Sequence, residues 1–104
     1  MSINRIELLE KFIAEDPTDP FNYYALALEY IKSGRNQDAH GQFQFLIETH
    51  SDYLPSYYHF GKLLEELGHF EDAIKVYKDG ILLARNQRNK KTENELQGAL
   101  DFIQ

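Results

Sequence analysis

The 104-residue sequence contains no cysteine and no tryptophan, and it has only three prolines and six glycines. Without cysteine the chain has no disulfide, no thiolate metal site and no cysteine nucleophile. So few turn-forming residues leave little room for the frequent turns of a β-sandwich or a β-barrel. We therefore expect an all-α protein, of a length that suits a single domain.

The sequence also lacks a long hydrophobic run. Its longest aliphatic stretch, Ile81 to Ala84, is far shorter than the roughly 20 residues that cross a bilayer. The first residues, MSINRIE, lack the apolar core of a signal peptide, and serine at position 2 does not fit the myristoylation pattern. These absences predict a cytoplasmic protein that does not bind membranes.

Positive charge is scarce, because 11 Lys and Arg residues face 17 Asp and Glu residues, which gives a net charge of −6. Such a field repels nucleic acid, so we expect no nucleic-acid partner. The exception is a run without acids that contains Arg85, Arg88, Lys90 and Lys91. A phosphate-binding patch is one interpretation of this run. We favour a helix C-terminus, where cations interact well with the helix dipole.

Catalytic and metal-binding motifs are missing as well. The sequence has no glycine-rich phosphate loop and no nucleophile and base at a recognisable spacing. None of its histidines is paired with another at a spacing of four residues, which a helical zinc site would need. We therefore predict no enzyme, no cofactor and no metal site. The four histidines in question are His40, His50, His59 and His69.

What the sequence does contain is a repeat with a spacing of 34 residues. When residues 20–53 are set above residues 54–87, six positions are identical, and several others are similar. The identical pairs are Tyr23 and Tyr57, Tyr24 and Tyr58, Gly34 and Gly68, Asp38 and Asp72, Ala39 and Ala73, and Ile47 and Ile81.

Each repeat has the pattern of two amphipathic helices that are separated by a glycine. In the second repeat, apolar residues recur at the spacing of one helix face on both sides of Gly68, which we expect to end the first helix in a left-handed conformation. The small residues Gly61 and Ala73 predict a close approach of the two helices. The two stripes are Tyr57, Phe60, Gly61 and Leu64, followed by Phe70, Ala73, Ile74, Tyr77 and Ile81.

This 34-residue pattern resembles the tetratricopeptide repeat. The resemblance implies an all-α, right-handed superhelix of antiparallel helix hairpins with about six helices. The sequence departs from the family pattern at position 4, where tyrosine replaces the usual tryptophan, and at position 27, where Leu46 and Gly80 replace alanine. The matching positions 4, 7, 8, 11, 20 and 24 are Tyr23, Leu26, Ala27, Tyr30, Ala39 and Phe43, then Tyr57, Phe60, Gly61, Leu64, Ala73 and Tyr77.

The flanking segments fit the same period, so we divide a single tetratricopeptide domain, residues 1–104, into four parts. Residues 1–19 form a half-repeat whose helix covers residues 3–14, residues 20–53 and 54–87 are the full repeats, and residues 88–104 form a capping helix. Thr92 to Glu95 is a capping-box motif that predicts the start of the last helix. Its apolar stripe, Leu96, Ala99, Leu100 and Ile103, should pack on Ile81 and Leu82.

In function, the resemblance implies a non-catalytic scaffold or adaptor that holds a peptide or helix of a partner protein in a concave groove. The tyrosines and the lysine implied for this groove suit an apolar side chain together with an acid. The alternative for Tyr24 and Tyr58 is that they pack on neighbouring helices. The alternatives for the whole protein are a self-associating homodimer and a fragment that completes a longer array. The implied groove residues are Tyr24, Leu28, Ile31, Tyr58, His59, Lys62 and Glu65.

Overall fold

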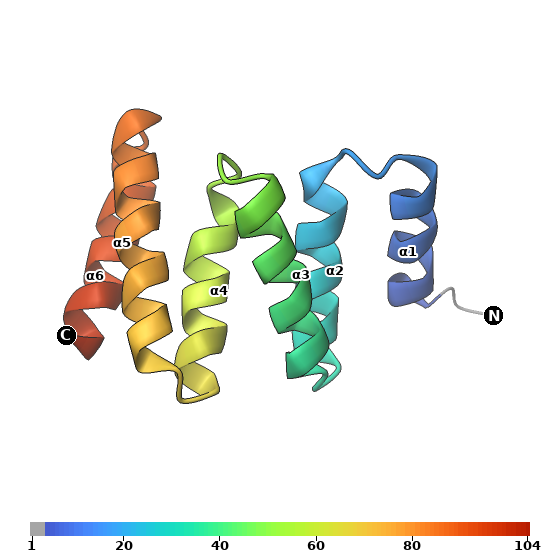
Figure 1. Cartoon of the computed structure of the whole chain (residues 1–104), viewed down its shortest axis with the longest axis horizontal. Helices are drawn as coiled ribbons and strands as arrows, with labels where there is room; N and C mark the ends of the chain where they lie inside the picture. The colour runs from blue at the N-terminus through green and yellow to red at the C-terminus, as the bar shows by residue number, and fades with distance from the viewer. Residues whose placement is uncertain (1–3) are drawn as a thin grey trace. The chain divides into compact units, whose positions relative to one another are not determined.

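The computed structural model describes residues 4–104, and within this range it contains six α-helices and no strand, as predicted (Figure 1). The chain forms two compact units, one that ends at Tyr53 and one that runs from Leu54 to Gln104. Unit 1 holds α1 (Arg5–Glu15), α2 (Pro20–Lys32) and α3 (Asn36–Thr49). Unit 2 holds α4 (Pro55–Glu66), α5 (Phe70–Asn86) and α6 (Lys90–Ile103).

Short polar and glycine signals set most helix boundaries. The side chain of Asp19 accepts a hydrogen bond from the Phe21 amide at 3.0 Å and so caps α2, whose first residue is Pro20. Gly34 and Gly68 follow the ends of α2 and α4 with φ angles of 76° and 79°. These are left-handed conformations that favour glycine, so the predicted helix stops are confirmed.

The predicted start of the last helix is wrong. α6 begins at Lys90, and Asn89 is its cap, because the Asn89 side chain accepts a hydrogen bond from the Thr92 amide at 3.0 Å. Asparagine is at least as good an N-cap as threonine. The motif that begins at Thr92 therefore lies inside the first turn of α6 rather than before it.

The basic run does not form one helix C-terminus either. Only Arg85 lies in the last turn of α5, whereas Lys90 and Lys91 begin α6, and Arg88 occupies the turn with a φ angle of 56°. Cations at a helix N-terminus face the positive end of the dipole. Glu93 offsets this charge, because it pairs with Arg85 at 2.8 Å and with Lys90 at 3.8 Å. The hydrogen bond from Arg85 is the main cause that lowers the pKa of Glu93.

The core of unit 1 lies between α2 and α3, which pack against each other as an antiparallel hairpin (Figure 1). α1 packs on α2 and contributes one buried side chain, Leu9, together with an ion pair between Arg5 and Glu29 at 2.8 Å. The remaining core is apolar apart from one phenol, and all of its residues except Ala25 lie on the apolar stripes that the repeat predicts for α2 and α3. Its residues are Ala25, Leu26, Ala27, Tyr30, Ala39, Phe43 and Leu46.

The core of unit 2 involves all three of its helices, because α5 packs against both α4 and α6. The predicted stripe of α4 is buried, and so are Ala73, Tyr77 and Ile81 of α5. Phe70 departs from the prediction, since it begins α5 and is 52% exposed. The buried apolar residues are Leu54, Tyr57, Phe60, Leu63, Leu64, Ala73, Tyr77, Ile81, Ala84, Leu96, Ala99 and Leu100.

Two glycines allow the helices of unit 2 to approach closely. A Cβ atom on Gly61 would lie 2.1 Å from Cε1 of Tyr77, so the glycine of α4 accommodates the tyrosine ring of α5, and not the alanine at position 73. A Cβ atom on Gly80 would lie 2.7 Å from the Cβ of Tyr57 and 3.0 Å from Cδ1 of Leu96. Gly80, which replaces the alanine of the family pattern, thus brings α5 close to both α4 and α6.

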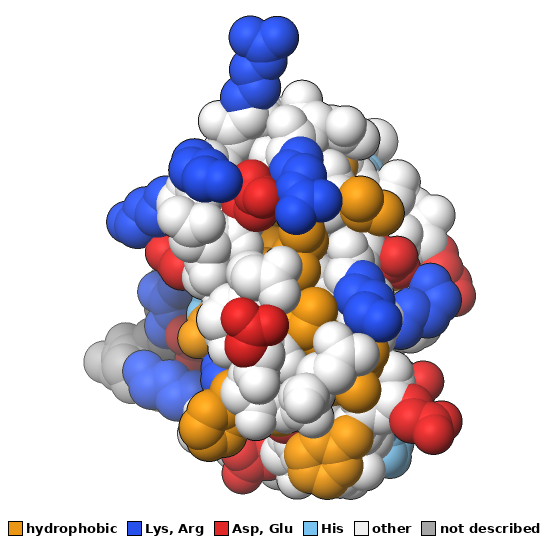
Figure 2. Space-filling view, turned by 90° about the vertical axis from the view of Figure 1, so that its left-hand side faces the viewer, with side chains coloured by type: hydrophobic (Ala, Val, Ile, Leu, Met, Phe, Trp, Pro, Cys, Tyr) orange, Lys and Arg blue, Asp and Glu red, His pale blue; other side chains and the backbone are white. Residues whose placement is uncertain are grey.

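The packing of α6 on α5 agrees only in part with the sequence prediction. Leu96, Leu100 and Ile81 are buried as expected. Leu82 is 58% exposed, because it lies at the outer edge of this helix pair instead of beneath α6. Figure 2, which faces the side where α5 and α6 lie, shows hydrophobic side chains at the surface among Lys and Arg side chains.

Candidate partner-binding faces

Four predicted groove residues lie along one stretch of α4. The ring of Tyr58 meets the ring of His59 edge-on, with 5.6 Å between their centroids. The Lys62 ammonium lies 5.7 Å from the centroid of the Tyr58 ring, within the range of a cation–π interaction. Lys62 also lies 3.8 Å from the carboxylate of Glu65, one turn further along. We call these four residues the α4 face.

α5 holds the last member of the α4 face in place. The hydroxyl of Tyr77 donates a short hydrogen bond to Oε2 of Glu65. The pKa of the Tyr77 phenol is strongly raised. Burial is the larger cause, and the hydrogen bond to Glu65 is the second. The neutral hydroxyl of Tyr77, on α5, therefore orients the Glu65 carboxylate. Lys62, on α4, approaches the same carboxylate oxygen.

The imidazole of His59 belongs to the half-buried part of the α4 face. Burial lowers the pKa of His59 below its ordinary value of 6.5, because a charged imidazolium is poorly solvated there. The ring is therefore mostly neutral at pH 7. It adds aromatic surface to the face, while Lys62 supplies the positive charge.

The predicted residues of α2, Tyr24, Leu28 and Ile31, share one side of that helix at spacings of four and three residues, and all three are half-buried. The Tyr24 ring lies 5.7 Å from the ring of Tyr53 in an edge-on arrangement. Burial raises the pKa of both phenols. Tyr24 therefore packs on a neighbour and keeps part of its ring at the surface, and its role in a groove stays a prediction. We call these three residues the α2 face.

Sequence reasoning missed two aromatic neighbours of the α2 face. Phe21 lies one turn before Tyr24, with ring centroids 6.5 Å apart, and it is 54% exposed. Tyr53 follows α3 in the chain. The spacing of three residues between Phe21 and Tyr24 was a usable signal, whereas the contact with Tyr53 depends on how the chain leaves α3.

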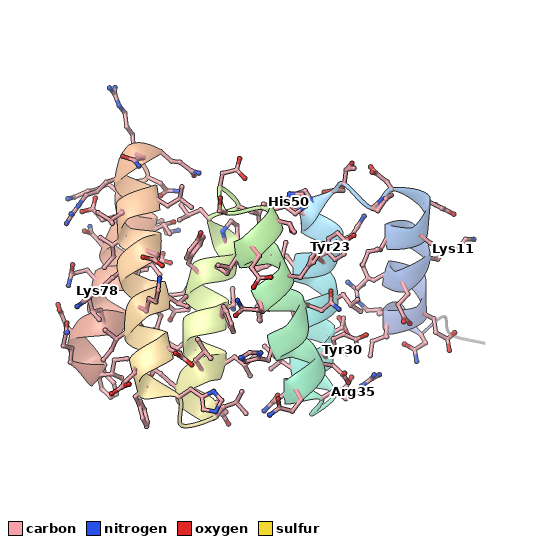
Figure 3. All side chains as sticks on the ribbon, viewed as in Figure 1. Lys11, Tyr23, Tyr30, Arg35, His50 and Lys78 are labelled. Atoms are coloured by element: carbon pink, nitrogen blue, oxygen red, sulfur yellow. The ribbon has the colours of Figure 1, made fainter. Side chains whose placement is uncertain are left out.

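The adjacent tyrosine of the repeat has a structural role. The Tyr23 ring lies 4.7 Å from the ring of Phe45 and 6.4 Å from that of His50, and its hydroxyl donates a hydrogen bond to the Pro17 carbonyl at 2.8 Å. Figure 3 labels Tyr23 and His50 at the same end of the α2–α3 hairpin. The two neighbouring tyrosines therefore have different roles. Tyr23 contacts the segments before α2 and after α3, and Tyr24 contributes to the α2 face.

Among residues 4–104, no group of three or more His, Cys, Asp or Glu side chains is arranged to hold a metal ion. None of the helices in this range is long and apolar enough to cross a membrane.

Comparison with known proteins agrees with the predicted family and with the bounds of the second repeat, but not with the bounds of the first. Two tetratricopeptide-repeat family models match the chain, one at residues 8–41 and one at residues 54–87. The curated proteins gave no match. Among solved structures, MamA is 24% identical with a TM-score of 0.74, and the match covers 94% of this chain but 50% of MamA. An identity of that size shows a shared fold alone.

Two structures of a tetratricopeptide repeat domain protein from Salinibacter ruber are more similar in sequence. The crystal structure is 44% identical with a TM-score of 0.78, and the match covers 82% of this chain and 94% of that one. The solution structure is also 44% identical, with a TM-score of 0.82 and coverage of 86% and 90%. With 44% identity over more than two thirds of this chain, the chain belongs to the tetratricopeptide repeat family.

Proposed function

We propose that this chain is an adaptor that binds short peptides or helices of partner proteins, with the α4 face as one binding surface and the α2 face as another. Tetratricopeptide repeat proteins in general act as protein-interaction modules and not as catalysts, and the proposal assigns that role to particular side chains. The observation that carries it is the α4 face, where an ammonium group lies over a half-exposed tyrosine ring.

The chemistry of the α4 face defines what it takes up. The rings of Tyr58 and His59 offer a flat apolar surface to an aliphatic or aromatic side chain. Lys62, whose side chain is 45% exposed, offers its remaining N–H donors to a carboxylate. A partner segment with an apolar residue and an acid next to it would satisfy both groups.

The α2 face is apolar apart from one hydroxyl. Leu28 and Ile31 supply an aliphatic wall next to the Tyr24 ring, and the exposed ring of Phe21 extends this surface by one turn. This composition selects apolar side chains on a segment that binds unit 1. Short segments bury little surface, so we expect a weak, transient complex with micromolar affinity.

Peptide selection with matched variants tests the proposal. Peptides selected from a random phage-displayed library on the wild type are measured by isothermal titration calorimetry against Tyr58→Ala, Lys62→Gln and Tyr24→Ala. We expect Tyr58→Ala and Lys62→Gln to weaken the peptides that bind the α4 face, and Tyr58→Ala to do so by about tenfold or more, as for a central aromatic contact. Tyr24→Ala should weaken the peptides that bind the α2 face. Lys75→Gln is the control, because Lys75 is an exposed lysine of α5 outside both faces.

Thermal melts show that the variants remain folded before binding is compared. Enrichment of acidic-apolar peptides whose affinity depends on Tyr58 and Lys62 supports the adaptor. Selected peptides that bind the three variants as tightly as the wild type contradict the proposed faces. A wild type that selects no peptide and sediments as a dimer identifies a self-associating module instead.

A further inference from the structure

A separate apolar groove lies between α5 and α6 on the outside of unit 2. Ile81, Leu82 and Leu100 supply its apolar surface, and its volume is about 300 Å³. Figure 2 shows this side of the molecule, where hydrophobic surface runs between Lys and Arg side chains. The complete lining is Lys78, Ile81, Leu82, Arg85, Gln97 and Leu100.

Two cations stand at this groove, and both belong to α5. Lys78, labelled at the edge of α5 in Figure 3, forms no ion pair or hydrogen bond with any residue from 4 to 104. Arg85 bonds Glu93 through Nε at 2.8 Å, which uses one of the five N–H donors of a guanidinium. The groove therefore combines an uncovered apolar surface with positive charge in a chain whose net charge is −6.

The spacing of the cations indicates the shape of an occupant. Lys78 and Arg85 are seven residues apart on α5, which places them two turns, or about 10 Å, apart along the helix. The exposed side chain of Leu82 lies between them. A helix that runs alongside α5 would meet this arrangement with carboxylates seven residues apart and aliphatic side chains midway between them.

From this complementarity we propose that the groove between α5 and α6 docks an acidic amphipathic helix of another protein. The aliphatic side chains of that helix cover Leu82 and Leu100, and its two carboxylates pair with Lys78 and Arg85. The residues of this groove belong to neither the α2 face nor the α4 face, so the chain binds this helix independently of the segments at those faces.

A designed peptide serves as the probe. It is an alanine-based helix of about 16 residues, with glutamates seven residues apart and two leucines midway between them. Its binding to the full chain is followed by fluorescence anisotropy and by amide chemical shifts in NMR spectra. We expect micromolar or weaker binding that declines as salt concentration rises, with shifts concentrated between residues 78 and 85 and between residues 97 and 100.

Variants of exposed residues distinguish this site from the rest of the surface. Leu82→Glu should abolish binding, and Lys78→Glu should weaken it about fivefold or more. A peptide with lysines in place of the glutamates should bind Lys78→Glu better than it binds the wild type. The controls are Lys75→Glu, on the same helix but outside the groove lining, and Tyr58→Ala on the α4 face, and neither should change the affinity.

Three results would overturn the proposal: equal binding of the glutamate and lysine peptides to the wild type, unchanged affinity of Leu82→Glu, or shifts centred on α4. Sedimentation of the free chain adds a fourth. A dimer that Leu82→Glu dissociates would show that a second copy, and not a partner helix, covers the groove. Because Tyr58→Ala is a control, failure at this groove leaves the adaptor proposal to stand or fall by its own variants.

Discussion

Unit 1 and unit 2 are built from the same 34-residue pattern, yet they carry very different charge. Unit 1 has four Lys and Arg against nine Asp and Glu, while unit 2 has seven against eight. The acidity of the chain is therefore concentrated in unit 1. Unit 2 is almost neutral, so an acidic segment of a partner meets less repulsion there, and both lysines proposed to bind carboxylates belong to it.

The two units also differ at three positions that act together. In unit 2, Gly61 leaves room for the Tyr77 ring, whose hydroxyl then reaches Glu65. The positions 34 residues earlier are all apolar. They are occupied by Ala27, Phe43 and Ile31. The second repeat thus has a polar contact at positions where the first repeat has apolar residues, and Gly61 leaves the space that the Tyr77 ring needs.

The largest contrast concerns the outer helices. α6 buries Leu96, Ala99 and Leu100, whereas α1 buries Leu9 alone. Deletion of residues 88–104 should lower the free energy of unfolding by about 3–6 kcal/mol, from two leucines at about 1.5–3 kcal/mol each. Deletion of residues 1–17 should cost about half as much. Urea unfolding of both variants measures the difference, and a stable, monomeric chain without α6 would contradict its role as a cap.

A smaller effect is expected at the glycine beneath the tyrosine ring. Gly61→Ala should destabilise the protein by about 1–3 kcal/mol, because the new Cβ overlaps a buried ring. The matched control is Gly41→Ala in α3, where the new Cβ meets nothing within 4 Å. That change should raise stability by up to about 1 kcal/mol through helix propensity. Thermal melts compare the two variants. If both melt above the wild type, or both below it, the close approach at Gly61 is wrong.

Replacing all three coupled residues sharpens the comparison. The variant Gly61→Ala, Glu65→Ile, Tyr77→Phe gives unit 2 the apolar set of unit 1. We expect it to be more stable than Gly61→Ala alone by about 1 kcal/mol, because replacing both partners of the Tyr77–Glu65 hydrogen bond with apolar groups leaves no buried polar group unpaired. Urea titrations of Gly61→Ala, of the variant Glu65→Ile, Tyr77→Phe, and of the triple variant together give the coupling energy. A triple variant that is less stable than the single one would show that the three positions do not act as a set.

The smallest effect is a dependence on high pH. Because the pKa of the Tyr77 phenol is raised in the folded protein, its contribution is complete below the ordinary value of 10.0 and is lost as pH rises above it. The stability advantage of the wild type over Tyr77→Phe should therefore be constant from pH 7 to 9. It should fall by about 1 kcal/mol by pH 11. If the free energy of unfolding depends on pH in the same way for both proteins, the Tyr77 phenol is not buried as described.

Sequence patterns were sufficient for the helices but not for their contacts. The glycines at 34 and 68 and the apolar stripes identified the hairpins, because these signals act within a few residues of the chain. The start of α6 was misplaced because Asn89 and Thr92 are both good caps and lie three residues apart. The turn that contains Arg88 decides between them, and its left-handed backbone has no signal in an arginine.

The candidate site shows the same limit. The positions on α2 and α4 followed from the repeat, since the family pattern assigns a face to each position. The repeat did not predict the hydrogen bond from Tyr77 to Glu65, because this bond depends on how closely α5 approaches α4 at Gly61. The uncovered groove beside Leu82 was missed for a related reason, since the apolar run of α5 does not reveal which of its residues α6 covers.

The helices that pack within each unit are consecutive in the chain: α1 with α2, α2 with α3, α4 with α5, and α5 with α6. Every such contact closes a short loop, so little chain entropy is lost before the first stabilising contacts form. Helical proteins with mostly local contacts fold within microseconds to milliseconds. A nascent chain of this kind assembles each hairpin soon after its second helix is synthesised, and its apolar stripes are exposed to other chains only briefly.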